Sequence, residues 1–248
     1  MKFIQPVNPE ERDFCRHIMD LLQNAEKNNF FRFSSFLTDR EQVLARAQAD
    51  AAGVQCGFWG GHKEAVRKMF SAPKAENEKY PLDAVTFFFR NSDMLTHRDF
   101  LGSMMSLGIK RNQIGDISVA DGGAVVFVSR TILPLIKETC KIGRVGVRTE
   151  TGIGIELPSQ KFEDIFLTVS SLRIDVLVSG ICGVSRDKSA AFIKSGRVIL
   201  NGIRILSSSV TVEPGDIFSV KGYGKFVFSD LGGVTRKGKN HITIKKYN

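Results

Sequence analysis

Four basic side chains follow one another within the stretch GVSRDKSAAFIKSGRVILNG, residues 183–202. They are Arg186, Lys188, Lys194 and Arg197. Lysine and arginine neutralise phosphates, and an arginine guanidinium can also bind two phosphate oxygens or stack on a base. Arg186 and Lys194 lie at helical spacing, on one side of a helix that includes Ala190. The stretch therefore predicts a phosphate-binding edge.

Two further basic segments follow in the chain. The loop KGYGKF (221–226) carries Gly222 and Gly224, whose lack of a side chain lets the backbone approach a phosphate closely. The stretch TRKGKNHITIKK (235–246) predicts a basic hairpin. The candidate RNA-binding side chains in these two segments are Lys221, Lys225, Arg236 and Lys237.

The charge of the chain is concentrated at one end. The 248 residues carry a formal net charge of +9. Residues 172–248 hold 13 Lys and Arg against 5 Asp and Glu, whereas residues 1–171 hold 22 against 21. The C-terminal block also contains ample Ile, Val, Leu and Phe, so it should fold. A folded basic block appended to a neutral body is typical of a protein that binds a polyanion.

The residue types that perform catalysis or hold metals are not clustered. The four cysteines and four histidines are scattered, without a Cys-x-x-Cys pair or the spacing of metal ligands. No combination of nucleophile, base and oxyanion donor is recognisable. We therefore expect no metal, no cofactor and no enzymatic activity, and the cysteines are expected to be reduced thiols.

Hydropathy points to a cytoplasmic protein. No apolar run approaches the length that a membrane span requires. The start, MKFIQPVNPEERDF, lacks the apolar core of a secretory signal.

The predicted phosphate-binding edge must be positioned by other elements, and the sequence predicts two helices and a small sheet for this. Residues 172–180 predict one short helix, with Arg173 at its start. Ser185 can cap a second helix, because its hydroxyl can accept an unpaired backbone N–H. On that helix Phe192 and Ile193 form the buried side. Asn201-Gly202 predicts a hairpin between two strands.

The middle of the chain predicts a β-α-β-β-α-β order. Strands are expected at 82–90, 116–120, 124–128 and 144–150, and helices at 96–107 and 130–140. This is the split βαβ order of ferredoxin-like and RNA-recognition folds. Phe88 is the candidate for stacking on an RNA base, against the alternative of ordinary packing within the sheet. One more strand is expected at 161–169.

The N-terminal part predicts mainly helices. Asn8 and Pro9 suit the start of a helix that runs to about Ala25. Thr38 and Glu41 form a capping box that opens a second helix, which ends near Gly53. A strand is expected at 54–59, a short helix at 62–70, and a linker at 71–81.

The C-terminal block resembles an S4 RNA-binding domain. The matching features are Leu-Arg-Ile-Asp, Ser-Arg, Ile-Lys-x-Gly-x-Val, Leu-Asn-Gly and Pro-Gly-Asp, in that order within residues 172–220. FLTDREQVLARAQADAAGV, FWGGHKEAVRKMF, HRDFLGSMMSLGIKRNQIGDI and TVSSLRID are similar to the YlmH family of bacterial S4-domain proteins, and the similarity covers most of the chain. The matching features add Arg173, Ser185 and Asn201 to the candidate RNA-binding residues.

The resemblance implies three domains in an α+β chain. They are an N-terminal helical α/β domain (1–80), a ferredoxin-like or RRM-like α+β domain (82–170) and a C-terminal S4-like RNA-binding domain (172–248). It also implies a non-catalytic protein that binds structured rRNA and, in a further role, peptidyl-tRNA. Its place would be the large ribosomal subunit, in quality control of stalled nascent chains.

Two other functions remain open. One is a scaffold linked to cell division, in which the neutral N-terminal body binds a protein partner. The other is an RNA-modifying enzyme with a divergent site. Neither the nucleophilic Asp loop of pseudouridine synthases nor the ATP signatures of tyrosyl-tRNA synthetases is recognisable in the sequence.

Overall fold

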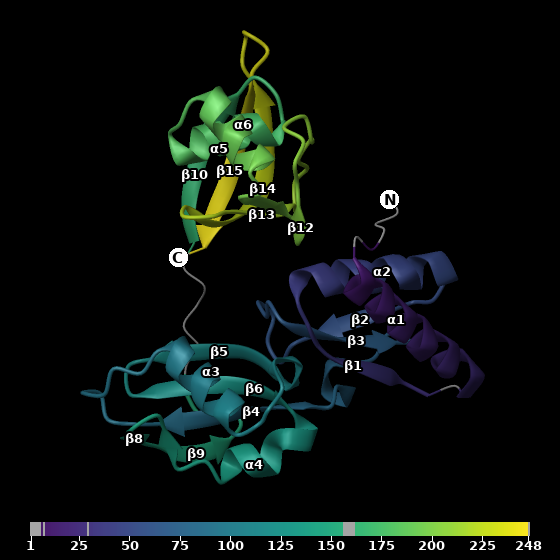
Figure 1. The fold of residues 1–248 in the computed structure, drawn as a ribbon, viewed down its shortest axis with the longest axis vertical. Coiled ribbons are helices and arrows are strands. Elements are labelled where there is room, and N and C mark those ends of the chain that lie inside the picture. Colours follow the sequence, from purple (N-terminus) through teal and green to yellow (C-terminus); the bar gives the residue numbers. More distant parts are fainter. Residues whose placement is uncertain (1–5, 7, 29, 156–161, 248) are drawn as a thin grey trace. The chain divides into compact units, whose positions relative to one another are not determined.

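The computed structural model describes residues 6, 8–28, 30–155 and 162–247 and divides into two compact units (Figure 1). The first unit spans residues 1–158 and the second spans residues 159–248. Both units combine helices with antiparallel sheets, so the α+β class predicted from the sequence is confirmed. Each unit has its own clusters of buried apolar side chains.

Two helices and a three-stranded antiparallel sheet form the N-terminal part of the first unit. The elements are α1 (Pro9–Asn28), β1 (Arg32–Leu37), α2 (Asp39–Ala52), β2 (Gly57–Trp59) and β3 (Lys68–Ala72), with strand order β1-β3-β2. The predicted caps are present: the Glu11 backbone N–H donates to Asn8 Oδ1 over 2.7 Å, and Thr38 and Glu41 form the capping box. Strand β1 has no counterpart in the sequence prediction.

The helix predicted at 62–70 is wrong. Residues 62–67 form turns and bends, and residues 68–70 belong to β3. In a helix, the backbone N–H groups of Val66 and Arg67 would bond to carbonyls four residues earlier. Here both donate to the carboxylate of Asp116, over 2.6 and 3.0 Å. A residue about fifty positions away thus fixes this segment in a non-helical conformation.

The segment predicted as a linker at 71–81 is a packed part of the fold. Ser71 and Tyr80 are buried, and their hydroxyl groups lie 2.8 Å apart. The Ser71 hydroxyl also accepts the Ala75 backbone N–H over 3.1 Å. The segment includes a short 3₁₀ turn at Asn77–Lys79. Polar composition suggested a linker, but these hydroxyls are satisfied within the protein.

The middle of the chain has the predicted β-α-β-β-α-β order. Its elements are β4 (Leu82–Phe88), α3 (His97–Ser106), β5 (Ile114–Ala120), β6 (Gly123–Ser129), α4 (Leu133–Lys137) and β9 (Arg148–Thr151), with strand order β5-β6-β4-β9. A hairpin of β7 (Lys141–Ile142) and β8 (Val145–Gly146) precedes β9, so the strand predicted at 144–150 is divided. The helix predicted at 130–140 is shorter. It begins as a 3₁₀ turn (Arg130–Ile132), and another such turn (Arg111–Gln113) precedes β5.

A shared core joins the N-terminal part to the middle sheet. Phe127 of β6 is 1% exposed and belongs to one cluster with Phe36 and Met69 of the N-terminal sheet. The His62 ring stacks on the Phe127 ring, with 4.9 Å between centroids. His62 Nε2 also lies 3.3 Å from Asp116 Oδ2. These contacts bury the face of the middle sheet that lies opposite α3 and α4.

The second unit packs two helices on a six-stranded antiparallel sheet (Figure 1). Its elements are β10 (Phe162–Val169), α5 (Ile174–Cys182), α6 (Arg186–Lys194), β11 (Val198–Leu200), β12 (Ile203–Arg204), β13 (Ile217–Val220), β14 (Gly224–Val234) and β15 (Asn240–Tyr247). The strand order is β10-β15-β14-β13-β11-β12. Phe192 and Ile193 of α6 are buried in its core, as their spacing predicted.

Strand β10 differs from the prediction in its partner. It was expected at 161–169 within the middle domain, and residue 161 lies outside the described residues. All eight of its residues pair with β15, from Phe162 opposite Tyr247 to Val169 opposite Asn240. The strand therefore belongs to the second unit rather than to the middle sheet. Sequence alone could not reveal this because the two strands are far apart along the chain.

Candidate nucleic-acid interface

A buried carboxylate organises the start of both helices in the second unit. Asp175 in the first turn of α5 is 4% exposed. Its Oδ1 accepts a hydrogen bond from Arg173 Nε over 3.0 Å, and its Oδ2 accepts one from Arg186 Nη2 over 2.9 Å. The side chains of Arg173 and Arg186 remain 41% and 58% exposed. One carboxylate thus holds two exposed guanidinium groups side by side.

Asp175 is therefore a site residue that sequence reasoning missed. It lies within the Leu-Arg-Ile-Asp feature, but no role was inferred for it. An acidic residue two positions after a basic one, in a block with so few carboxylates, was the available signal. The structure gives it the role of orienting Arg173 and Arg186.

The hydrogen bonds from Arg173 and Arg186 to Asp175 make the stability of the second unit depend on pH. Burial alone would raise the pKa of Asp175, but hydrogen bonds from Arg186 and Arg173 outweigh it and hold the pKa below its usual value. A carboxyl whose pKa is lowered by folding stabilises the fold above its unfolded pKa of about 3.9, and this is lost as pH falls through the folded pKa.

We expect Asp175→Asn to destabilise the second unit at neutral pH and to have little effect at acid pH. Hydrogen bonds to charged groups contribute about 1.5 to 3 kcal/mol each, so the loss at pH 7 should be of that order. Hydrogen exchange of α5 and α6 peptides across a urea series, at both pH values, measures it. A loss that is equally large well below the folded pKa would show that the charge of Asp175 does not matter.

Helix α6 presents the predicted lysines at its surface. The Ser185 hydroxyl accepts the Lys188 backbone N–H over 3.3 Å, so Ser185 acts as the cap that the sequence predicted. The side chains of Lys188 and Lys194 are exposed. Ser189 is buried, and its hydroxyl donates to the Asp175 carbonyl over 2.7 Å. This bond ties α6 to α5 and fixes the position of the basic edge.

Arg197 connects the end of α6 to the turn between β13 and β14. Its guanidinium lies over the Phe192 ring, 4.2 Å from the centroid, and its Nη2 donates to the Lys221 carbonyl over 2.8 Å. In return, the Lys221 backbone N–H donates to the Arg197 carbonyl over 2.9 Å. Arg197 and Lys221, far apart in sequence, are therefore brought together.

The remaining predicted residues lie elsewhere in the unit. Asn201 has φ 49°, and its side chain bonds to Asp216 and to the Ile217 backbone N–H, so its amide is used to build the turn. The Lys225 ammonium lies 5.1 Å from the centroid of the Tyr247 ring. Arg236 and Lys237 are exposed in the turn between β14 and β15.

On the described part of the middle sheet, Thr86 and Phe88 are packed within the protein. Thr86 is fully buried, and its hydroxyl both donates to the Gly152 carbonyl over 2.8 Å and accepts the Gly154 N–H over 2.7 Å. The guanidinium of Arg148 lies over the Phe88 ring, 4.8 Å from its centroid. In this structure Phe88 is thus covered by Arg148 and by the chain around Gly154. Ordinary packing describes it better than the base-stacking hypothesis.

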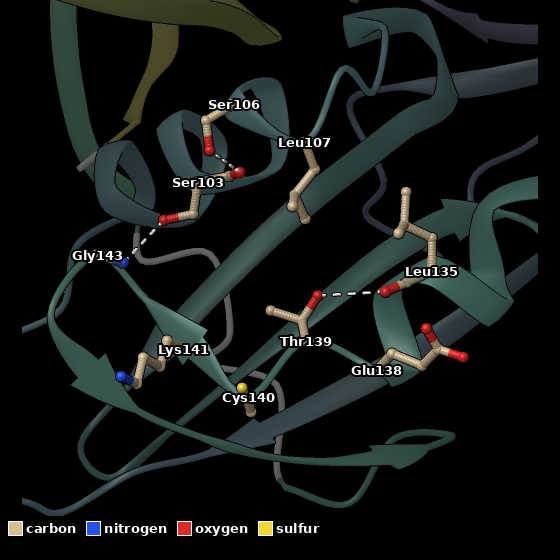
Figure 2. Close-up of a pocket in the computed structure, with 9 residues that line it drawn as sticks. All are labelled: Ser103, Ser106, Leu107, Leu135, Glu138, Thr139, Cys140, Lys141 and Gly143. Carbon is tan, nitrogen blue, oxygen red and sulfur yellow. Dashed lines mark hydrogen bonds between the residues drawn. The ribbon is translucent and has the colours of Figure 1, made fainter.

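A cleft of about 410 Å³ lies beside α3 and α4 of the middle domain (Figure 2). Its lining includes the exposed thiol of Cys140 and the hydroxyls of Ser103 and Thr139. Ser103 Oγ accepts the Gly143 N–H over 2.9 Å, and Thr139 Oγ1 donates to the Leu135 carbonyl over 3.3 Å. Both hydroxyls are therefore used in local hydrogen bonds that stabilise the fold, and neither is bonded to a side chain that could act as a base.

In the described part of the chain, no group of three or more His, Cys, Asp and Glu side chains could hold a metal ion. None of the helices described is both long and apolar enough to cross a membrane.

Comparison with known proteins supports the resemblance seen in the sequence. A family model described as the putative RNA-binding domain in YlmH matches residues 84–153. A protein of Bacillus subtilis (strain 168) named ribosome-associated protein quality control protein P2 is 27% identical over 250 residues, which cover 98% of this chain and 97% of that protein. The chain is thus similar to the YlmH family.

A solved structure is similar to this chain in fold. It is titled cell division protein ylmH from Streptococcus pneumoniae, and it matches 60% of this chain and 95% of its own with a TM-score of 0.53 at 19% identity. The match of the YlmH model falls on the middle domain and not on the basic C-terminal block. An RNA surface in that block therefore remains a proposal.

Proposed function

We propose that this protein binds structured RNA through the basic edge of its second unit, which has the helix pair and small sheet expected of an S4-like domain. The observation that carries the proposal is the pair of exposed guanidinium groups held on Asp175. We define the basic edge as Arg173, Arg186, Lys188, Lys194, Arg197 and Lys221.

Preorganisation is the physical reason for choosing this surface. A guanidinium has five N–H donors. Arg186 donates a hydrogen bond from its Nη2 to Asp175 Oδ2. A side chain held in this way loses less rotational freedom when it binds a phosphate than a free one does. The surrounding block carries the excess positive charge of the chain, which attracts a polyanion from a distance.

The biological setting rests on the relative's name. The B. subtilis protein is named for ribosome-associated quality control. We propose the same role here: a non-catalytic, cytoplasmic protein that binds rRNA of the large ribosomal subunit, with peptidyl-tRNA as a further partner. The middle domain, which the YlmH model describes as putatively RNA-binding, would add a second contact. The N-terminal part is proposed to bind a protein partner.

The test removes three charges from the basic edge. The triple variant Arg186→Ala, Lys194→Ala, Arg197→Ala should lose ribosome co-sedimentation at temperatures where it is folded, and its melting temperature should fall because Arg186 no longer bonds to Asp175. For each phosphate that the variant no longer neutralises, the slope of log affinity against log salt should fall in magnitude by about 0.7 to 0.9. Affinity for a fully paired RNA hairpin, measured at several salt concentrations, gives this slope.

A matched variant controls for net charge. Arg12→Ala, Arg16→Ala, Lys27→Ala removes three positive charges from α1, where all three side chains are exposed. It should bind the ribosome as the wild type does. If the two triple variants behave alike, the basic edge is not the RNA surface. A protein partner recovered without RNA would favour the scaffold function instead.

A further inference from the structure

One aromatic side chain lies close to Arg197 and Lys221 of the basic edge and has no role in the proposed function. Tyr223 is in the turn between β13 and β14, flanked by Gly222 with φ 91° and Gly224 with φ 124°. These conformations suit glycine, so the turn is held in a shape that other residues rarely adopt. The backbone N–H of Tyr223 donates to the Val220 carbonyl over 2.9 Å.

The Tyr223 ring packs at a tilt against the Phe192 ring, which Arg197 also contacts. Its centroid lies 5.8 Å from that of Phe192, with 43° between the ring planes. The Arg197 guanidinium covers the Phe192 ring at 4.2 Å. Phe192 is 7% exposed and anchored in the core, whereas Tyr223 is only partly buried. The protein thus supports the ring of Tyr223 from one side and leaves part of it accessible.

Basic side chains lie close to both glycines that flank this ring. Arg197 donates to the Lys221 carbonyl, so both basic residues meet at the turn. On the other side, Lys246 Cε lies 3.7 Å from the position that a Cβ of Gly224 would occupy. Glu163 lies 3.4 Å from the Lys246 ammonium, on the neighbouring strand edge. Arg197, Lys221 and Lys246 are therefore at or near the turn that carries the Tyr223 ring, and Lys246 is also close to Glu163.

We infer that Tyr223 stacks on a single unpaired RNA base, next to phosphates held by Arg197 and Lys221. Aromatic rings and guanidinium planes are the groups on which proteins stack splayed-out bases, and neighbouring cations hold the backbone. A hydrophobic protein partner is disfavoured by the cations around so small an apolar surface. The inference rests on the proposed function and adds to it a preference for RNA with a bulged or flipped base.

The experiment uses the full chain and two RNA hairpins that differ only by one bulged adenine. Wild-type protein should bind the bulged hairpin more tightly than the fully paired one. Tyr223→Leu, which retains apolar packing on Phe192, should weaken binding of the bulged hairpin at least about fivefold and leave the paired hairpin unchanged. Tyr223→Phe should bind both as the wild type does. A fluorescent purine analogue at the bulge should be quenched by wild type and not by Tyr223→Leu.

Phe166→Leu is the matched control. Phe166 is an aromatic residue of the same unit that is 74% exposed and lies on β10. Its substitution should change neither affinity. Equal binding of the two hairpins by wild type, unchanged binding by a folded Tyr223→Leu, or an equal loss in Phe166→Leu would each overturn the inference. Failure of the proposed function has a different signature, because the triple basic variant would then bind the paired hairpin normally.

Discussion

Phe127→Ala should lower the free energy of unfolding of the first unit by about 3 to 5 kcal/mol, the usual cost of removing a buried phenylalanine side chain. The side chain lies between the two parts of that unit. Its ring stacks on the ring of His62. Gly115 lies so close to it that a Cβ added to Gly115 would be 3.1 Å from the Cβ of Phe127. Removing the ring leaves a cavity that the polar contacts around Asp116 prevent from collapsing.

Trp59 provides the measurement. It is the only tryptophan of the chain and packs against the same cluster of buried residues. Its fluorescence during urea unfolding therefore follows the first unit. Phe30→Ala is the control, because that phenylalanine is 67% exposed and surface substitutions usually change stability by less than about 0.5 kcal/mol. A loss below about 1 kcal/mol in Phe127→Ala would mean that the two parts do not depend on this contact.

Ile193→Ala is expected to have a comparable effect on the second unit. Ile193 of α6 is fully buried against the sheet, so its truncation should cost about 2 to 5 kcal/mol. Hydrogen exchange of α5, α6 and β13 peptides reports the loss. Leu206→Ala is a suitable comparison, since Leu206 belongs to the same unit and is 63% exposed.

This variant also separates folding from RNA recognition. We expect Ile193→Ala to lose RNA affinity only under conditions where the second unit is partly unfolded. The triple basic variant should lose affinity while folded. If Ile193→Ala weakened RNA binding without any change in exchange, the helix would contribute to recognition in a way that its burial does not explain.

The sequence predicted best those features that depend on neighbouring residues. Thr38 with Glu41, and Ser185, each satisfy backbone N–H groups within one turn of helix, so their types and spacing were sufficient. Asn201-Gly202 likewise determines its turn by local conformation, with φ 49° and 76°. The positions of α6 and of the β11–β12 hairpin followed from these signals.

The features that were missed depend on distant residues. The helical pattern of residues 62–70 is real, but Asp116 takes the backbone N–H groups that a helix would need. Strand β1 is stabilised by pairing with β3, thirty or more residues later. In the candidate site, the basic residues were found by charge, whereas the bond from Arg197 to Lys221 and the packing of Tyr223 against Phe192 exist only after folding.

The pairing of β10 with β15 affects how the protein folds during its synthesis. Strand β15 lies between β10 and β14 in the sheet, although β10 comes first in the second unit and β15 follows all of its other strands along the chain. The N-terminus of the chain emerges first during synthesis. Strand β10 therefore cannot pair with β15 until every intervening strand and helix has been translated. The first unit can fold while the ribosome is still making the second. The second unit acquires its complete sheet, and with it a rigid basic edge, only once β15 has emerged, so a nascent chain that has not reached β15 does not yet present this surface to the ribosome that makes it.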